Sequence, residues 1–121
     1  MSPAKRVQPH LGRTQRLVMG VLFDHGVWQT GAPYGVGTDG QTRASLVTLV
    51  NRGLARLHAD RFCLTEAGYA WMICEAAADL RMVSFGSVGA DMAIQRITHL
   101  AQCARLVGAQ GGPVDWRGNP V

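Results

Sequence analysis

Apolar residues recur at intervals of three and four positions in four segments of the chain, and they alternate with polar residues in a fifth region. The three-to-four spacing predicts helices over residues 14–25, 41–52, 66–82 and 91–106. The alternation lies at residues 54–58 and 61–64, on either side of Ala59-Asp60, and is typical of a two-stranded hairpin. This order predicts a mainly α fold with one small β-hairpin.

Residues suited to helix ends stand at the borders of these segments. Small polar side chains that can accept hydrogen bonds from free backbone N–H groups are expected to cap the four helices. They are Thr14, Asp39, Thr65 and Asp91. Gly26 and Gly53 follow the first two helices, where a left-handed residue commonly ends a helix.

The helix predicted at residues 41–52 has an apolar and a polar side. Leu46, Val47 and Val50 are expected to face the core, with Leu54 completing the stripe. The opposite face then carries polar side chains of the kind that contact nucleic-acid grooves. They are Gln41, Ser45, Thr48 and Arg52.

The helix predicted at residues 66–82 has apolar residues on two sides. Its main stripe runs from Tyr69 to Leu80, and a second line lies nearly opposite. The second line consists of Trp71, Cys74, Ala78 and Met82. A helix that is apolar on two sides usually packs between two neighbours. The second neighbour is expected to be the last helix or another subunit.

Three segments lack periodicity and are expected to be irregular. They are a basic arm over residues 1–12, a glycine-rich stretch over residues 27–40 and a tail over residues 108–121, in which Trp116 is the expected large anchor. The intervening parts, residues 13–82 and 83–107, are expected to form one domain and a C-terminal packing or dimerisation helix. A chain of 121 residues with 47% apolar residues is long enough to bury a core.

Positive charge is concentrated in the first half of the chain. Residues 1–64 carry eight basic and three acidic side chains, a net charge of +5. Residues 65–121 carry four basic and five acidic side chains, a net charge of −1. A polyanionic partner is therefore expected to bind the N-terminal half.

The sequence contains no pattern that predicts membrane insertion or export. The longest apolar run, residues 17–23, is much shorter than the roughly 20 residues that a bilayer requires. No apolar segment follows Lys5 and Arg6 closely enough to form a signal peptide. We expect a cytoplasmic protein without membrane contact.

Several residues of types that carry chemistry lack the partners that the chemistry needs. Cys63, Cys74 and Cys103 form no close pair, so free thiols are expected. Cys74, His99 and Cys103 are candidate zinc ligands without a fourth ligand, and His58 beside Cys63 is a similar incomplete set. The Gly35-x-Gly37-x-x-Gly40 motif follows no buried parallel strand, so no nucleotide site is expected. We find no catalytic constellation and expect a non-enzymatic protein without cofactor or metal.

Two short motifs, in this order and spacing, resemble the winged helix-turn-helix regulators of the MarR and PadR kind. They are Arg52-Gly53-Leu54, after the second helix, and Leu64-Thr65-Glu66-Ala67-Gly68, between the hairpin and the third helix. The resemblance covers about residues 14–82. It implies a winged helix-turn-helix domain over residues 13–82, in which the hairpin is the wing.

By this resemblance, the helix at residues 41–52 would enter the major groove of double-stranded DNA. Arginines of the hairpin would grip phosphates or the minor groove, assisted by the basic arm. The residues expected to contact DNA are Gln41, Thr42, Arg43, Ser45, Thr48, Arg52, Arg56, Arg61, Lys5 and Arg6. The implied function is that of a small transcriptional regulator or architectural protein, acting as a homodimer through the helices at residues 66–82 and 91–106.

A second function fits the same pattern. The polar face of the 41–52 helix can be an ordinary solvated face, and the domain would then bind another protein. The partner would dock on the glycine-rich loop, on the apolar line with Trp71 or on the tail with Trp116.

Overall fold

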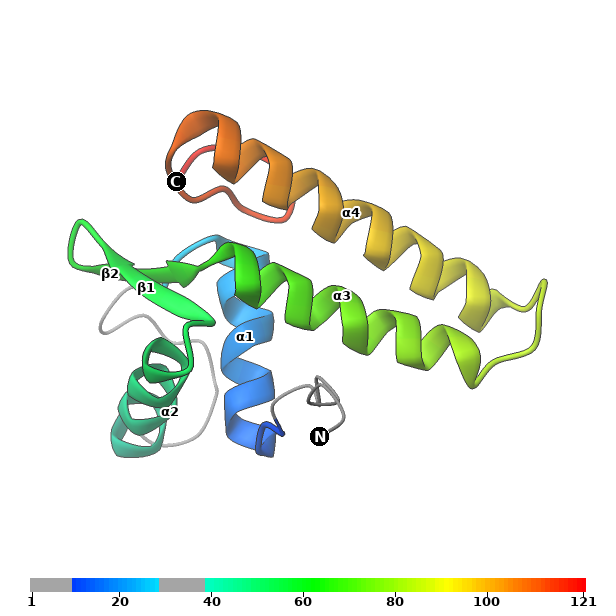
Figure 1. Ribbon diagram of the computed structural model, residues 1–121, viewed down its shortest axis with the longest axis horizontal. Coiled ribbons are helices and arrows are strands. Elements are labelled where there is room, and N and C mark those ends of the chain that lie inside the picture. Colours follow the sequence, from blue (N-terminus) through cyan, green and yellow to red (C-terminus); the bar gives the residue numbers. More distant parts are fainter. Residues whose placement is uncertain (1–9, 29–38) are drawn as a thin grey trace, which may run out of the picture.

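A computed structural model describes residues 10–28 and 39–121 (Figure 1). These residues form four helices and one two-stranded antiparallel hairpin, which confirms the predicted mainly α fold. In chain order the elements are α1 (Arg13–His25), α2 (Asp39–Asn51), β1 (Ala55–His58), β2 (Arg61–Leu64), α3 (Glu66–Arg81) and α4 (Val88–Gln110). The arm at residues 1–9 and the glycine-rich residues 29–38 lie outside the described residues.

The first helix begins one residue earlier than predicted, and Thr14 is not its cap. Gly12 takes the N-cap position, and its N–H donates to Oε1 of Gln15 at 2.9 Å. The predicted stop at Gly26 is confirmed, because this residue ends α1 with a φ of 80°. A β-carbon on Gly26 would also lie 2.5 Å from the carbonyl oxygen of Val114, so the tail packs directly against this turn.

The hairpin has a tight two-residue turn. Ala55 pairs with Leu64, Arg56 with Cys63, Leu57 with Phe62 and His58 with Arg61. His58 and Cys63 therefore lie diagonally across the hairpin rather than directly opposite each other. Ala59 and Asp60 have φ angles of 50° and 64°, the signs of a type I′ turn, whose twist matches that of the strands. Trp28 adds a third, single-residue strand, because its N–H donates to the carbonyl oxygen of Phe62 at 2.8 Å.

The two motifs of the sequence meet at one corner between α2, the hairpin and α3. Thr65 caps α3 as predicted, since its side-chain oxygen accepts from the N–H of Gly68 at 3.1 Å. The same hydroxyl donates to the carbonyl oxygen of Gly53, and the N–H of Thr65 donates to that of Leu54 at 3.2 Å. The corner thus joins the end of α2 to the start of α3, which sets where the hairpin projects.

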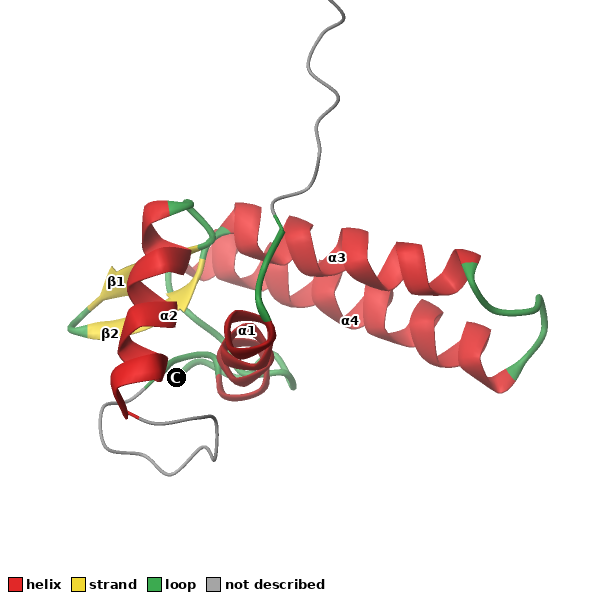
Figure 2. Ribbon diagram, turned by 90° about the horizontal axis from the view of Figure 1, so that it is seen from below, coloured by secondary structure: helices red, strands yellow, loops and turns green. Residues whose placement is uncertain are grey.

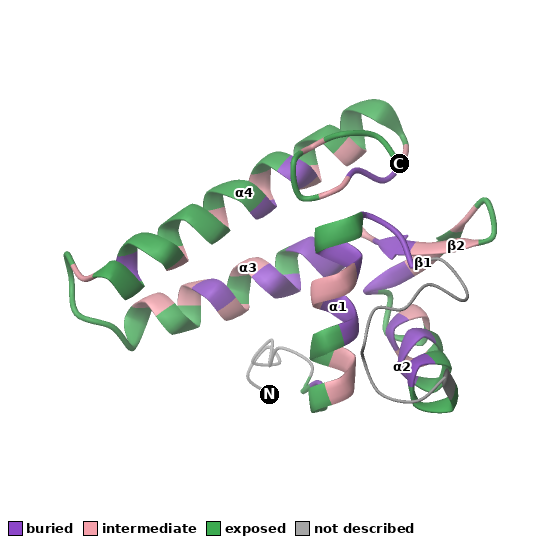
Figure 3. Ribbon diagram, turned by 180° about the vertical axis from the view of Figure 1, so that it is seen from behind, coloured by how far each residue is buried: buried purple, intermediate pink, exposed green. Residues whose placement is uncertain are grey.

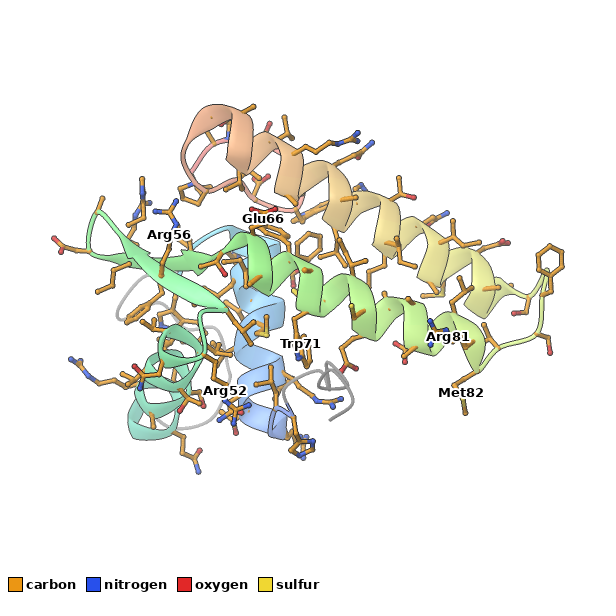
Figure 4. The ribbon with its side chains drawn as sticks, viewed as in Figure 1. Arg52, Arg56, Glu66, Trp71, Arg81 and Met82 are labelled. Carbon is orange, nitrogen blue, oxygen red and sulfur yellow. The ribbon has the colours of Figure 1, made fainter. Side chains whose placement is uncertain are left out.

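The third and fourth helices form a long antiparallel pair that extends beyond α1 (Figure 2). Ser87 caps α4 and accepts from the N–H of Ala90 at 3.1 Å, so the expected cap at Asp91 is wrong and the helix starts earlier. Trp71 is buried, whereas Cys74, Ala78 and Met82 are exposed. The second apolar line of α3 is therefore covered at Trp71, which lies beside α1 (Figure 4), whereas the far end of α3 is exposed or half-buried (Figure 3).

The core lies where α1, α2, the hairpin and the near ends of α3 and α4 meet. Its largest fully buried side chains include Met19, Leu22, Leu49, Leu64 and Leu100. The tail closes this core through a different residue from the one expected. Val114 is fully buried, whereas Trp116 is 42% exposed.

None of the helices within the described ranges has both the length and the apolar character that crossing a bilayer requires.

Candidate nucleic-acid interface

The second helix contacts the core through a face other than the predicted one. Thr42 and Ser45 are only 7% and 6% exposed, and they lie beside buried Leu46 and Leu49. Val47, expected inside, is 46% exposed. The helix is thus turned by about one residue, roughly 100°, from the predicted orientation.

The physical reason is the spacing of the two leucines. Leu46 and Leu49 lie on one side of α2, and the residues at helical spacing before them are Thr42 and Ser45. Both polar side chains are small enough to pack against the core beside the leucines. They are therefore unavailable as DNA contacts, and that part of the prediction is wrong.

The outward centre of α2 is a row of small side chains that sequence analysis missed. We call Gly40, Ala44, Val47 and Asn51 the outer row; all four are exposed. Their spacing of four, three and four residues places them along one line of the helix, opposite Leu46 and Leu49. This spacing was visible in the sequence, but the apolar Val47 had been assigned to the core.

Predicted contact residues flank the outer row on both sides. Arg43 is exposed on one side, and Gln41, Thr48 and Arg52 lie on the other. The hydroxyl of Thr48 donates to the carbonyl oxygen of Ala44 at 2.9 Å, so its one hydrogen-bond donor is already used within the helix. Nη1 of Arg52 donates to the carbonyl oxygen of His10, which ties the end of α2 to the chain before α1.

The hairpin arginines point away from α2. Arg56 and Arg61 share one face of the hairpin with His58 and Cys63, because paired residues of an antiparallel hairpin project to the same side. This face lies toward the tail: Nη2 of Arg61 donates to the carbonyl oxygen of Val121 at 3.3 Å. In Figure 4, Arg56 stands on the tail side of the hairpin and Arg52 lies on the other side, near the start of α1. The basic residues therefore form two groups rather than one ridge.

The two hairpin arginines affect the pKa of the Cys63 thiol, which lies on the same face of the hairpin. Burial raises the pKa of Cys63 above its ordinary value of 9.0, and the positive charges of Arg56 and Arg61 oppose that rise. Nη1 of Arg56 also lies 3.5 Å from Nδ1 of His58.

The candidate DNA-contacting arginines have no acidic partner among the side chains of residues 10–28 and 40–121. Between described residues the ion pair joins Nη1 of Arg16 to Oε2 of Glu75 at 3.9 Å. Over residues 10–28 and 40–121, Arg43, Arg52, Arg56 and Arg61 pair with no Asp or Glu side chain. Their charges remain available to a polyanion. Lys5 and Arg6, predicted to assist, lie outside the described residues.

The candidate zinc ligands do not come together. Cys74 is exposed on α3, while Cys103 is buried on α4 with its Sγ 3.5 Å from the carbonyl oxygen of Asp115. His99 instead packs edge-on against Trp116, with ring centroids 6.1 Å apart. Over residues 10–28 and 40–121, no three His, Cys, Asp or Glu side chains are grouped to hold a metal ion.

Comparison with protein-family models, with curated proteins and with solved structures gives no match to this chain.

Proposed function

We propose that this chain is a non-enzymatic winged helix-turn-helix protein that binds double-stranded DNA through α2, as a small cytoplasmic transcriptional regulator or architectural protein. The observation that carries the proposal is the surface of α2. The outer row of this helix is exposed, and Arg43 and Arg52 flank it without acidic partners over residues 10–28 and 40–121. A free helix face bordered by cations suits insertion into a groove lined by phosphates.

The order of elements around α2 supports the winged-helix part of the proposal. A helix, a single-residue strand at Trp28, a second exposed helix and a hairpin follow one another, and Trp28 pairs with the second hairpin strand. The hairpin would be the wing beside the groove-binding helix.

The two separate groups of arginines are expected to contribute unequally to DNA binding. Arg43 and Arg52 border the exposed face of α2, so they would supply the main phosphate contacts, Arg52 through the guanidinium N–H groups that do not bond the carbonyl oxygen of His10. Arg56 and Arg61 lie on the tail side of the hairpin, where Arg61 already bonds the carbonyl oxygen of Val121. Their contribution would be smaller than the sequence alone predicts.

Fluorescence anisotropy with a labelled random duplex tests this proposal. The wild-type protein should bind with an affinity that falls steeply as salt rises, because bound arginines release counterions from DNA. Arg43→Ala and Arg52→Ala should each weaken binding by about 1–3 kcal/mol with little change in melting temperature. Arg117→Ala, which removes an exposed tail arginine, is the matched control. Absence of salt-dependent binding by the wild type would refute DNA binding.

The far end of the α3–α4 pair supports homodimerisation. Large apolar side chains are exposed there on the connection that follows α3 and on the start of α4, and Met82 points away from α4 in Figure 4. They are Met82, Val83, Phe85, Val88 and Met92, with exposures from 38% to 104%. An apolar cluster of this kind typically marks an interaction surface. Two copies joined through these helices would present two α2 helices to DNA.

The same surface favours the second candidate function, binding of another protein. Light scattering after size-exclusion chromatography separates the two functions. If the chain is a homodimer, the wild type should have twice the monomer mass. The double variant Met82→Lys/Phe85→Ser should then have the mass of a monomer. If the wild type is monomeric and binds no DNA, but retains a partner that the double variant loses, the chain is a protein-binding module.

A further inference from the structure

The outer row of α2 is uncharged although cations border it. It consists of two short apolar side chains, a glycine and, at its C-terminal end, the amide of Asn51. Gly40 and Ala44 have little or no side chain, so the first half of the helix can approach another surface closely. Val47 projects beyond them with 46% of its surface exposed.

These side chains match the chemistry of one class of base pair. In the major groove, thymine presents a methyl group that apolar side chains contact. Adenine presents an acceptor at N7 and a donor at N6, which an Asn amide can bond together. Guanine is instead read mainly by Arg or Lys, and the outer row contains neither.

We propose that the outer row reads A·T base pairs in the major groove, with Val47 against a thymine methyl group and Asn51 on an adenine edge. The inference rests on the proposed DNA binding and adds its sequence preference. It also moves base recognition from Gln41, Ser45 and Thr48 to residues that sequence analysis assigned elsewhere or did not consider.

The dimensions of the helix agree with this assignment. Gly40 and Asn51 are eleven positions apart, which corresponds to about 16 Å along a helix, or roughly five base pairs. Val47 and Asn51 are one turn apart, so they would contact bases about two steps apart. Arg43 on one flank and Arg52 on the other would hold the phosphates on the two walls of the groove. This charge distribution favours DNA over an apolar protein as the occupant of α2.

The test begins with selection of preferred sites from a randomised duplex pool by the wild-type protein. The selected site should contain A·T pairs at its centre. Replacing each thymine in turn by deoxyuridine removes only the 5-methyl group. One replacement should weaken wild-type binding about fourfold, the effect of one buried methyl group. For Val47→Ala, the same replacement should have little effect.

Asn51 is tested in the same way with 7-deazaadenine, which lacks the N7 acceptor. One such replacement should weaken wild-type binding at least about fivefold. Asn51→Ala should bind normal and modified duplexes equally. Leu17→Ala, a truncation of an exposed apolar residue on α1, must keep the wild-type ratio for both modified duplexes. Val47→Ser, which removes both methyl groups, serves if Val47→Ala is poorly folded.

The outcomes separate this inference from the proposed function. DNA binding with a G·C-only site, or with unchanged deoxyuridine sensitivity in Val47→Ala, overturns A·T reading by the outer row and leaves DNA binding intact. Failure of the wild type to bind any duplex overturns both.

Discussion

Gly68 faces the carbonyl oxygen of Leu54 so closely that a β-carbon at position 68 would lie 2.2 Å from that oxygen. This contact brings the first turn of α3 against the chain that leaves α2. The hydrogen bonds of Thr65 to the same stretch reinforce the contact. The direction of the hairpin relative to α2 therefore depends on the absence of a side chain at position 68.

Gly68→Ala should destabilise the protein, although alanine is the better helix former. The new methyl group must displace the backbone of Leu54, and such overpacking costs about 1–3 kcal/mol or more. Gly108→Ala is the control, because it makes the same change in α4 with no atom within 4 Å of the new group. It should stabilise the protein by up to about 1 kcal/mol. Urea unfolding measures both, and equal effects would show that the corner is not tightly packed.

The hairpin turn should be open to stabilisation. Ala59 and Asp60 adopt positive φ angles, which cost about 1–2 kcal/mol for an ordinary residue. Ala59→Asn with Asp60→Gly places the preferred type I′ pair in the turn and should raise the free energy of unfolding by about 1–2 kcal/mol. Ala78→Asn, on the exposed side of α3, should instead lower it by about 0.5 kcal/mol. A lower melting temperature for the turn variant would argue against this turn type.

The tail should stabilise the fold through Val114. Val114→Ala removes a fully buried side chain beneath the chain end and should cost about 1–3 kcal/mol in urea unfolding. The same substitution at Val47, which is half exposed, should change stability by less than about 0.5 kcal/mol. If Val114→Ala were as mild as Val47→Ala, the tail would not be part of the core.

Stability should fall under alkaline conditions. Burial raises the pKa of Tyr69, and to a lesser extent the neighbouring thiols of Cys103 and Cys63 raise it. Burial also raises the pKa of Cys103, as does the charge of Asp115. A raised folded-state pKa keeps these groups protonated when the unfolded chain has lost its protons. Stability is therefore complete below the ordinary values of 9.0 and 10.0 and is lost as pH rises through and above them.

Urea unfolding between pH 7 and pH 11 measures this loss. Tyr69→Phe should make the decline above pH 10 shallower, because the variant lacks the buried phenol. A decline of equal slope in wild type and variant would assign the pH dependence to other groups.

Much of the fold followed from local patterns. The helix stop at Gly26, the cap at Thr65 and the hairpin around Ala59-Asp60 were predicted from residues within a few positions of each other. The two misplaced caps also have local causes. The last helix starts at Ser87, before the first residue of its apolar stripe. At the start of the first helix, the side chain of Gln15 accepts from the N–H of Gly12, so Gly12 takes the cap position.

The candidate site was predicted less well, for a physical reason. Val47 is more apolar than Thr42 and Ser45, but it lies on nearly the opposite side of α2 from Leu49, so the helix cannot bury both, and the larger Leu49 is the one buried. Leu46 and Leu49 decide the orientation together, and they bring Thr42 and Ser45 inward with them.

By itself, the sequence determined which segments form the helices and the hairpin and which half of the chain carries the positive charge. These properties depend on neighbours along the chain. Only the tertiary structure decided that α2 presents Ala44, Val47 and Asn51 to the outside, and that Arg56 and Arg52 lie on opposite sides of the hairpin. Those outcomes depend on packing between segments distant in sequence, such as Gly68 against Leu54 and Arg61 against Val121.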